Sequence, residues 1–292
     1  MKFLNFGSLN LDIVYTVDHC VRPGETLASE KIEYFCGGKG LNQSIALAKA
    51  GAQVYHAGCV GADGAKLIKE LESNGVNTSF IKKTDAPSGH AIIQVDKSGQ
   101  NSILIFGGAN RLIDKAQIDS VFHNFSQPDV LFLQNEINVV GAIIDTAYSK
   151  SMTVVFNPSP FSDLILELPL DKVSWFVVNK IEAHALTGRT ETDEIISEFK
   201  VRYPNSNILL TLGEKGSYCH YNEKTYYQPI FNVKAIDTTA AGDTYLGYFF
   251  ALLDSCGVEK AMQYASAASA LAVSRQGASA SIPLFNETEK FI

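Results

Sequence analysis

Long hydrophobic runs, paired cysteines and clusters of basic residues are all missing from this sequence. No stretch approaches the ~18 apolar residues that a transmembrane helix needs. The N-terminal segment MKFLNFGSLNLDIV carries one early Lys and reaches Asn5 before any long apolar run, so it predicts a strand and not a signal peptide. The five cysteines, at positions 20, 36, 59, 219 and 256, form no C-x-x-C pair, which favours reduced thiols over a disulfide framework or a zinc site. We therefore expect a soluble, cytoplasmic protein.

The charge balance argues against one class of partners. The formal net charge is −7 at pH 7, and no run of Lys or Arg interrupts the acidic background. Because binding to nucleic acid or to an anionic membrane needs basic patches, neither partner is expected. Hydrophobic residues make up 46% and charged residues 19% of the 292 positions, which allows a large core and argues against general disorder.

Short apolar runs alternate with amphipathic segments along the whole chain. The strands that this pattern predicts are Phe3–Gly7, Val54–Val60, Asp129–Gln134, Thr153–Asn157, Trp175–Asn179 and Ile208–Leu212. The predicted helices are Leu41–Ala50, Asp63–Asn74, Asp114–Phe125, Val139–Lys150 and Thr192–Arg202. Runs such as VLFLQ and ILLTL are apolar at all but one position, as expected of parallel strands covered on both faces. We predict an α/β fold with a doubly wound, mostly parallel sheet flanked by helices.

Two stretches depart from this alternation. Residues 12–36 contain short alternating segments and a turn at Pro23–Gly24, and residues 88–110 read as a hairpin with its turn at Lys97–Gln100. Since neither has an obvious helix, we expect them to form a small β-sheet lid over the edge of the main sheet. We find no linker, internal repeat or low-complexity tract. The chain is therefore predicted to be a single domain, residues 1–292, with a lid formed by approximately 12–36 and 88–110.

The strongest signal for chemistry is the segment IDTTAAGDTYLGYFFALL, residues 236–253. It predicts a strand that ends at Ile236, then the small residues Ala240, Ala241 and Gly242, and an apolar helix that begins near Asp243. Small residues let a phosphate approach the backbone, and the unpaired N–H groups of a helix start can bind it. A carboxylate in the first turn could accept the proton of an attacking alcohol. The alternative is that Asp243 only caps its helix.

Two further motifs each allow two interpretations. In CGGKGLNQSIALAKAG, residues 36–51, three glycines precede a predicted helix. Their spacing matches neither a Walker A loop nor G-x-G-x-x-G, so they indicate either a ligand loop or a packing turn. Asn10 and Asp12 lie two residues apart on a predicted strand and therefore face the same side. They could bind neighbouring hydroxyl groups of a ligand, or they could simply face solvent.

Taken in order, these motifs resemble the ribokinase family of carbohydrate kinases, and the resemblance covers nearly the whole chain. GGKGLNQSIALAKAG resembles the family's first signature and DTTAAGDTYLGYF its second. Four further segments match in the expected order: RPGET at 22–26, NPSP at 157–160, VVNKIEAHALTG at 177–188 and LLTLGEKGSY at 209–218. The resemblance implies a ribokinase-like fold and an ATP-dependent transfer of phosphate to a sugar hydroxyl.

The resemblance also implies roles for particular residues. Asp243 would be the catalytic base, and the backbone amides of Ala240, Ala241, Gly242 and Asp243 would form the anion hole. The other residues that would hold the sugar are Asn10, Asp12, Gly38, Lys39, Asn42 and Glu136. Those that would lie along ATP are Asn179, Thr211, Leu212, Gly213 and Gly216. Asn179 and Glu182 would organise Mg²⁺ through its waters, and a monovalent cation such as K⁺ would bind at Asp237, Thr239 and Ser281.

The resemblance also implies a substrate, and the predicted lid implies an assembly. SLNLDIV, GGKGLNQ and Glu136 favour D-ribose, phosphorylated at O5, with adenosine, another nucleoside or another sugar as the alternative. A nucleoside kinase would place aromatic lid residues against the base, and Phe35 and Phe106 are the candidates. A sugar- or nucleotide-binding regulator without catalysis is the competing class, although the intact Asp243 argues against it. The apolar face and open edges of the predicted lid indicate a homodimer formed through the lid.

Overall fold

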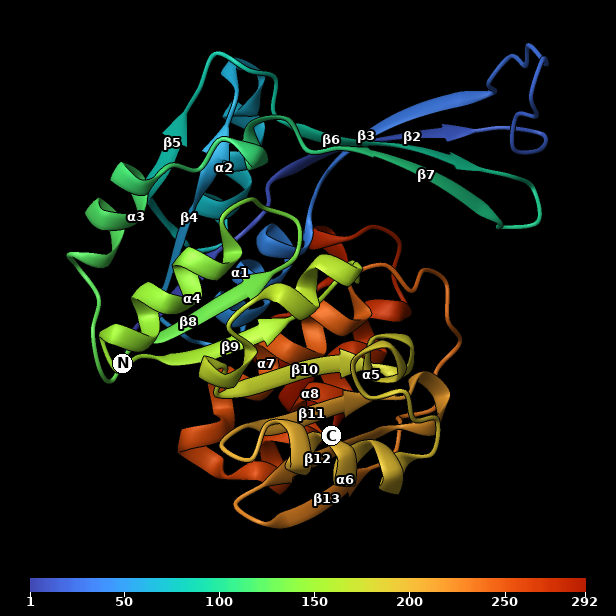
Figure 1. The fold of residues 1–292 in the computed structure, drawn as a ribbon. Helices are drawn as coiled ribbons and strands as arrows, with labels where there is room; N and C mark the ends of the chain where they lie inside the picture. The colour runs from blue at the N-terminus through green and yellow to red at the C-terminus, as the bar shows by residue number, and fades with distance from the viewer.

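A nine-stranded sheet forms the centre of the computed structural model, which describes residues 1–292 (Figure 1). The strand order is β13-β12-β11-β10-β9-β8-β1-β4-β5. The strands from β11 to β5 run parallel, whereas β12 is antiparallel to both of its neighbours, β11 and β13. The strands are β1 (Phe3–Phe6), β4 (Val54–Val60), β5 (Asn77–Lys83), β8 (Val130–Gln134), β9 (Thr153–Asn157), β10 (Trp175–Asn179), β11 (Asn207–Thr211), β12 (Ser217–Tyr221) and β13 (Lys224–Gln228).

Helices cover both faces of this sheet. On one face lie α1 (Lys39–Lys49), α2 (Ala65–Ser73), α7 (Ala241–Cys256) and α8 (Val258–Val273), with α9 (Phe285–Phe291) packed beside α8. On the other face lie α3 (Lys115–Phe122), α4 (Val140–Ser149), α5 (Lys180–Thr187) and α6 (Thr192–Arg202). Short 3-10 turns occur at Ala62–Gly64, Gly108–Arg111, Asp163–Glu167, Leu170–Lys172, Gly213–Lys215 and Ser279–Ser281. No helix is both long and apolar enough to cross a lipid bilayer.

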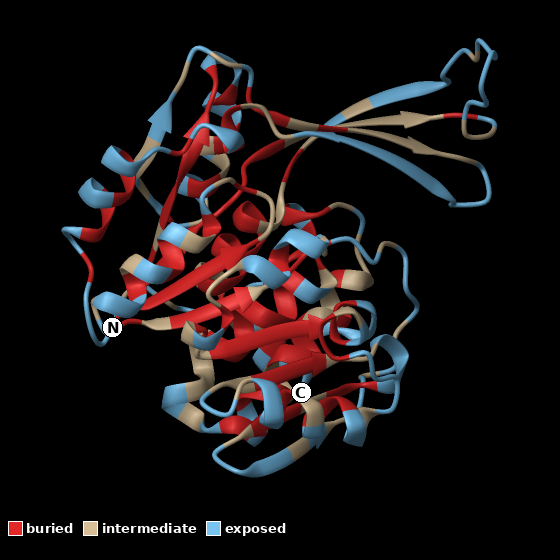
Figure 2. Ribbon diagram, in the orientation of Figure 1, coloured by how far each residue is buried: buried red, intermediate tan, exposed pale blue.

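Alternating side chains of the central strands build two separate apolar cores. Along β8, Val130 and Phe132 pack under α1 and α7, whereas Leu131 and Leu133 pack under α3 and α4. Successive side chains of a strand point to opposite faces, so a strand covered on both sides must be apolar at every position. Figure 2 shows the result as a band of buried residues through the middle of the molecule. The rigid sheet fixes the loops that follow its strands.

A separate four-stranded sheet forms the lid and projects from one end of the main body (Figure 1). Its order is β3-β2-β6-β7, with β2 (Asn10–Thr16), β3 (Lys31–Gly37), β6 (Gly89–Val95) and β7 (Asn101–Phe106). Strand β2 pairs antiparallel with β3 and parallel with β6, and β6 and β7 form the predicted hairpin. Most lid residues are exposed or half-buried (Figure 2), because no helix covers either face.

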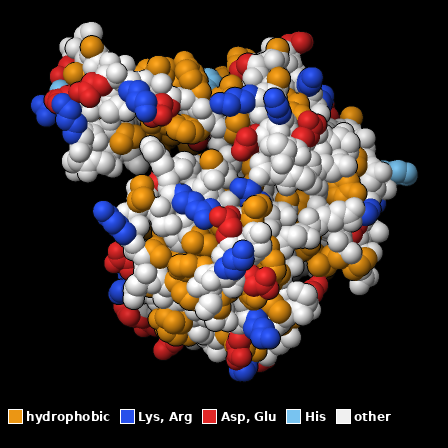
Figure 3. All heavy atoms as spheres, turned by 180° about the vertical axis from the view of Figure 1, so that it is seen from behind, with side chains coloured by type: hydrophobic (Ala, Val, Ile, Leu, Met, Phe, Trp, Pro, Cys, Tyr) orange, Lys and Arg blue, Asp and Glu red, His pale blue; other side chains and the backbone are white.

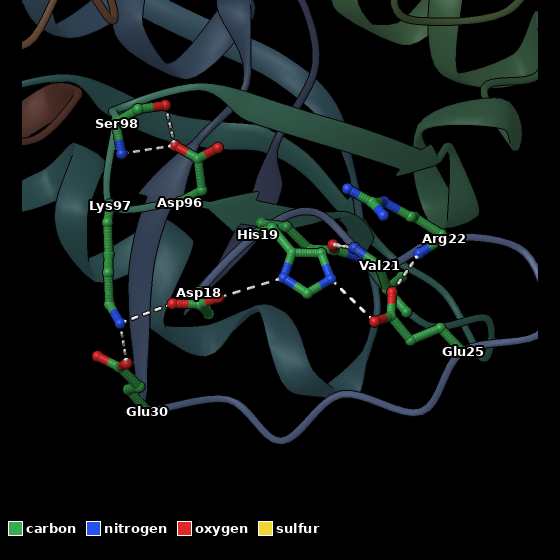
Figure 4. Close-up of polar contacts among 10 residues, drawn as sticks. Asp18, His19, Val21, Arg22, Glu25, Glu30, Asp96, Lys97 and Ser98 are labelled. Carbon is green, nitrogen blue, oxygen red and sulfur yellow. Dashed lines mark hydrogen bonds and ion pairs between the residues drawn. The ribbon is translucent and has the colours of Figure 1, made fainter.

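Charged side chains tie together the outer end of the lid (Figure 4). The Lys97 ammonium lies 2.7 Å from Asp18 and 3.2 Å from Glu30, and it thereby joins the hairpin turn to the loop between β2 and β3. The His19 ring lies between Asp18 and Glu25, and hydrogen bonds to Glu25 and then to Asp18 raise its pKa. Exposed ion pairs of this kind contribute little to stability, but they hold the two loops in one arrangement.

The predicted central strands and helices are confirmed, with ends displaced by a few residues. One prediction was wrong: no strand ends at Ile236, since residues 229–238 are neither helix nor strand. Ile236 is 64% exposed, and its backbone N–H donates to the Val273 carbonyl at the end of α8 instead of a strand. Strands β5, β12 and β13 were not anticipated, because they lie at or next to the edges of the sheet and mix polar with apolar residues.

Candidate active site

Polar side chains gather where the central parallel strands end. Ser8 follows β1, Glu136 follows β8, and Asn157, Asn179 and Thr211 end β9, β10 and β11. In open α/β sheets the carboxyl ends of parallel strands meet at one edge, and ligands bind in the crevice outside it. The predicted site residues from distant parts of the chain are therefore placed along one edge of the sheet.

Asp243 lies in the first turn of α7 and faces α1. Its Oδ1 accepts a hydrogen bond from Gln43 Nε2 at 2.9 Å, and its Oδ2 accepts one from Asn42 Nδ2 at 3.1 Å. The N-cap of α7 is Ala240, which adopts a left-handed conformation with φ 60° and receives no side-chain cap. The alternative that Asp243 only caps its helix is therefore wrong. Its carboxylate is buried and held in one orientation by two amide donors.

The residues before Asp243 expose backbone donors. The N–H groups of Gly242 and Asp243 donate to no protein acceptor, whereas the Ala241 N–H makes a long bond of 3.3 Å to Thr238 O. A Cβ added at Gly242 would meet no protein atom within 4 Å. The protein's own packing thus leaves room for a side chain at this position. Free N–H groups at a helix start form an anion-binding arrangement, in which a small residue lets the anion come close.

The sugar-binding candidates converge near the base of the lid. Asn10 and Asp12 occupy the same face of β2, as predicted, and Asn110 Nδ2 donates to Asn10 Oδ1 at 2.8 Å. Glu136 accepts hydrogen bonds from Ser8 Oγ and, at 3.0 Å, from the Lys39 backbone N–H. These bonds join the ends of β1 and β8 to the start of α1.

Burial and charge shift the ionisation of these groups. Burial, with a smaller contribution from the charge of Glu136, raises the pKa of Asp12 to about 7. Burial also raises the pKa of Glu136, although Lys39 and the hydrogen bonds from Ser8 and the Lys39 N–H oppose the shift. Burial lowers the pKa of the Lys39 ammonium, but the carboxylates of Asp243, Glu136 and Glu182 outweigh it, so the net shift is upward. Lys39 is thus a cation within reach of three carboxylates.

The glycines at the start of α1 permit close packing against the end of β1. Gly38 has φ 93°, a left-handed conformation that other residues rarely adopt. A Cβ at Gly40 would lie 2.4 Å from Ser8 N and 2.7 Å from Gly7 Cα, so α1 can begin against the end of β1 only with glycine there. Gly40 is therefore a packing residue, and the close packing brings Lys39 next to Glu136 and Asn42 next to Asp243.

A cleft of about 710 Å³ opens on the other side of the AAGD segment. It is lined by Thr211, Gly213, Gly216, Ala241 and Gly242 among others. Its apolar walls come from the irregular segment 230–235 and from α8: Ile230, Phe231, Val233, Ala270 and Val273. A mostly apolar cleft of this size with a few polar groups suits a nucleotide. Leu212, expected along ATP, instead packs partly buried against the core on the α4 to α6 face.

The two candidate cation sites differ in their local structure. Asn179 and Glu182 form a capping box at the start of α5, in which Glu182 accepts from the Asn179 N–H and from Asn179 Nδ2, both at 3.0 Å. No cluster of three or more His, Cys, Asp or Glu side chains is arranged to hold a metal ion. Asp237 joins two loops by accepting from the Thr239 N–H at 2.9 Å and from the Gly277 N–H at 3.0 Å. Ser281 is buried in the same region and donates to Ala278 O.

Several site residues were missed by the sequence reasoning. Ser8, Gln43, Asn110 and Gln134 all bond to predicted site residues or to their neighbours. Gln43 directly follows the predicted Asn42, so its position in the glycine-rich motif was the one available signal. The wall of the cleft formed by α8 was also missed, although its run of small residues, ASAASALAV, is the kind of surface that a flat ligand can approach.

Comparisons with known proteins identify the family and the fold of this chain. The model of the pfkB family carbohydrate kinases matches residues 2–284. The ribokinase of Haemophilus influenzae is 35% identical over 296 residues, covering 98% of this chain and 96% of that protein. The deoxyribokinase of Salmonella typhi is 32% identical and covers 100% of this chain and 99% of that protein. The structure of Arabidopsis thaliana ribokinase complexed with ribose and ATP has a TM-score of 0.88 and 28% identity, covering 99% of this chain and 98% of that one.

Proposed function

The chain belongs to the pfkB family of carbohydrate kinases, and we propose that it transfers the γ-phosphoryl group of ATP to O5 of D-ribose, forming D-ribose 5-phosphate. The observation that carries this proposal is the position of Asp243. Its carboxylate is fixed against the sugar-binding candidates of α1, and the preceding Gly242 lines the nucleotide cleft. The family relationship supports phosphoryl transfer to a sugar hydroxyl, and relatives named as ribokinases support ribose.

In the proposed reaction, Asp243 accepts the proton of the attacking hydroxyl. The sugar oxygen forms a bond to the γ-phosphorus while the bond from that phosphorus to the bridging oxygen of ADP breaks. The free N–H groups of Gly242 and Asp243 stabilise the charge that spreads over the transferring group. Lys39, held among carboxylates, adds a positive charge nearby. Positioning and charge stabilisation thus supply most of the rate enhancement.

Each ligand is assigned its own set of residues. The sugar would be held by Asn10, Asp12, Gly38, Lys39, Asn42 and Glu136, together with Asp243. ATP would lie along Asn179, Thr211, Gly213 and Gly216 with its phosphates at Ala240 to Asp243. The residues form one α/β domain, 1–292, with a lid at 12–36 and 88–110 that excludes water during transfer.

Two cations complete the proposal. Mg²⁺ would be held mainly by the phosphates and by water molecules that Asn179 and Glu182 orient. Each Glu182 carboxylate oxygen accepts one hydrogen bond within the capping box, which leaves each oxygen a free lone pair to accept a hydrogen bond from such a water. When bound, it neutralises phosphate charge. K⁺ would lie between the two loops that Asp237 joins, with Thr239 and Ser281 among its oxygen donors. A cation there would hold the loop leading to the anion hole.

The positions of Phe35 and Phe106 on the lid bear on the choice between a sugar and a nucleoside. Phe35 is the cross-strand partner of Asp12, so its ring lies on the sugar face of the lid and could also stack on a base. Phe106 pairs with His90, which is opposite Leu11, so it lies on the other face and cannot serve that purpose. Ribose therefore stays the first candidate and a nucleoside the second.

Exposed apolar residues on the lid support a homodimer. Tyr34, Ile103, Leu104, Ile105 and Phe106 are each at least half exposed, and Figure 3 shows hydrophobic side chains along this projecting sheet. An uncovered sheet with an open edge strand is normally paired or covered. By the strand register, Ile103 and Ile105 lie on the same face as Asp12, whereas Tyr34, Leu104 and Phe106 lie on the opposite face. Packing two lids together through that opposite face would bury Tyr34, Leu104 and Phe106. The five free cysteines suit a reducing compartment, so we place the enzyme in the cytoplasm.

The proposal is tested by measuring ADP release in the presence of MgATP and K⁺ with a panel of possible acceptors. The panel contains D-ribose, deoxyribose, arabinose, fructose, adenosine and cytidine. We expect the highest kcat/KM for D-ribose. Preference for deoxyribose or a nucleoside would keep the reaction and overturn the substrate. Binding of ribose and ATP without ADP release would support the non-catalytic regulator instead.

A further inference from the structure

Four side-chain amides, three buried and one half-buried, form a continuous hydrogen-bonded chain that ends on Asp243, and Asn42 bonds to the other oxygen of the same carboxylate. The chain begins on β1 and passes through β8 and α1, with a branch to β9. Its members are Asn5, Gln134, Gln43 and Asn157. Asn5, Gln43 and Gln134 are at most 1% exposed, although they are polar. Buried polar groups are costly unless they are bonded, so such a row beneath one helix needs an explanation.

The two ends of this amide chain fix its direction. Asn5 Nδ2 donates to the Gly40 carbonyl at 2.9 Å, and Asn157 Nδ2 donates to the Val177 carbonyl at 2.8 Å. A carbonyl can only accept, so both asparagines must turn their Oδ1 atoms toward the middle of the chain.

The orientation of the middle members follows from these ends. Gln134 Nε2 donates to Asn5 Oδ1 at 3.1 Å and to Gln43 Oε1 at 2.6 Å. With its oxygen used in this way, Gln43 must direct its NH₂ group toward Asp243 Oδ1, at 2.9 Å, and Asn157 Oδ1, at 3.3 Å. The main-chain carbonyls at both ends therefore determine which atom of Gln43 meets the catalytic carboxylate.

We propose that Gln43 is a positioning residue for the kinase reaction, which holds the Asp243 carboxylate in the orientation that receives the sugar proton. The proposal rests on the proposed role of Asp243 as the base. Gln43 donates to one carboxylate oxygen and Asn42 to the other, so the carboxylate cannot rotate without losing a bond. Asn42 is also assigned to the sugar, whereas Gln43 is 0% exposed and acts only through Asp243. Gln134 in turn sets the orientation of the Gln43 amide.

A purely structural role would predict a different result on substitution. Gln43 would then only fill space between α1 and the sheet, and changing it would lower stability without altering the reaction. Ser44 supplies the comparison, because it is the next residue of α1, is 0% exposed and bonds to His56 Nδ1 at 2.8 Å without contacting Asp243. Removing its hydroxyl removes a buried hydrogen bond of the same helix.

The experiment compares Gln43→Glu, Gln43→Met and Ser44→Ala with the wild-type chain. For each, kcat and the sugar KM are measured from pH 5.5 to 9, with whichever sugar of the panel the wild type phosphorylates, and Tm is measured in parallel. Gln43→Glu keeps the shape but sets a second carboxyl against Asp243, and two such groups hold a proton between them to higher pH. We expect the rise of kcat on the acid side of the pH profile to occur at least one pH unit higher in Gln43→Glu than in the wild type. We expect Gln43→Met to lose at least tenfold in kcat, with the sugar KM within threefold.

Ser44→Ala should lower Tm and leave the kcat profile unchanged. Wild-type kcat profiles in Gln43→Glu and Gln43→Met would overturn the positioning role, whatever their Tm. If Gln43→Glu does not fold, the kcat of Gln43→Met decides alone. Asp243→Asn, measured alongside, separates the two failures. An inactive Asp243→Asn with normal Gln43 variants refutes only the positioning role, whereas an active Asp243→Asn refutes the proposed base and its positioning together.

Discussion

Phe35 on β3 lies directly opposite Asp12 on β2, so the aromatic ring and the carboxylate leave the lid on the same face. Phe106, at the far edge of the same sheet, leaves it on the opposite face. The two aromatic residues therefore provide a matched pair for testing which face of the lid covers the sugar.

Replacing Phe35 with Ala should raise the KM for ribose about five- to tenfold, since losing a partly buried aromatic contact costs about 1 kcal/mol or more. Phe106→Ala removes the same ring from the other face and should leave KM within twofold. Steady-state kinetics with varied ribose measure both. An equal increase of the ribose KM in the two variants would mean that the lid does not turn the face with Phe35 and Asp12 toward the sugar.

The raised pKa of Asp12, about 7, predicts pH-dependent sugar binding. Ribose hydroxyls donate hydrogen bonds, which favour the charged carboxylate, so binding should tighten as the pH rises through 7. The ribose KM should fall between pH 6 and 8, and Asp12→Asn should remove this dependence. A KM that changes with pH equally in both proteins would assign the effect to another group.

The same shift has the opposite consequence for the ligand-free protein. The carboxyl group of Asp12 binds its proton more tightly in the folded protein than in the unfolded chain. The contribution of this protonated group to the free energy of unfolding is therefore fully present below about pH 4 and is lost as the pH rises toward 7. Between those limits, Asp12→Asn should reduce the decline of the free energy of unfolding with pH, measured by urea denaturation. An unchanged slope would contradict the assignment of this pKa to Asp12.

Gly242→Ala should fold normally and fail with ATP. The added methyl group meets no protein atom and lies at the start of a helix, but it would occupy the space that the phosphate needs. We expect at least a tenfold loss of kcat/KM for ATP without a fall in Tm. Gly141→Ala, in the first turn of α4, is the control: the added Cβ would make only ordinary contacts at 3.4 Å, and the variant should be more stable by about 0.4–1 kcal/mol with normal kinetics. A Gly242→Ala enzyme with normal ATP kinetics would place the phosphates elsewhere.

The proposed dimer can be tested with two exposed leucines. Leu104 on β7 of the lid is 68% exposed, and Leu164, in a 3-10 turn of the main body, is 69% exposed. Leu104→Glu should shift sedimentation from dimer to monomer at micromolar concentration, whereas Leu164→Glu should not. A wild-type chain that sediments as a monomer would refute the lid contact outright.

The parts of the fold that the sequence revealed are those in which one physical demand dominates. Strands such as β8 are covered on both faces, so nearly every residue is apolar and the run is conspicuous in the sequence. Edge strands such as β13, KTYYQ, have one partner and mixed surroundings, and no such signal marks them. The predicted strand ending at Ile236 failed because an apolar residue on an irregular, exposed segment looks the same in sequence as one in a strand.

The residues of the candidate site likewise fall into those that the sequence could predict and those that it could not. Gly38 and Asp243 lie in compact local motifs, which sequence reasoning can find. Glu136 and Gln134 gain their meaning only from partners far away in the chain, such as Ser8 and Gln43, and no local pattern encodes a contact across the sheet. The resemblance to a family supplied Glu136 but gave no reason to select Gln43.

The central claim is that Asp243 accepts the proton of the sugar hydroxyl, and the variant Asp243→Asn tests it most directly. The substitution keeps the size of the side chain and removes its ability to take the proton. In an ADP-release assay with saturating MgATP, K⁺ and D-ribose, we predict that kcat falls by about three orders of magnitude or more while the ribose KM stays within a few-fold. Turnover close to that of the wild type would contradict the account.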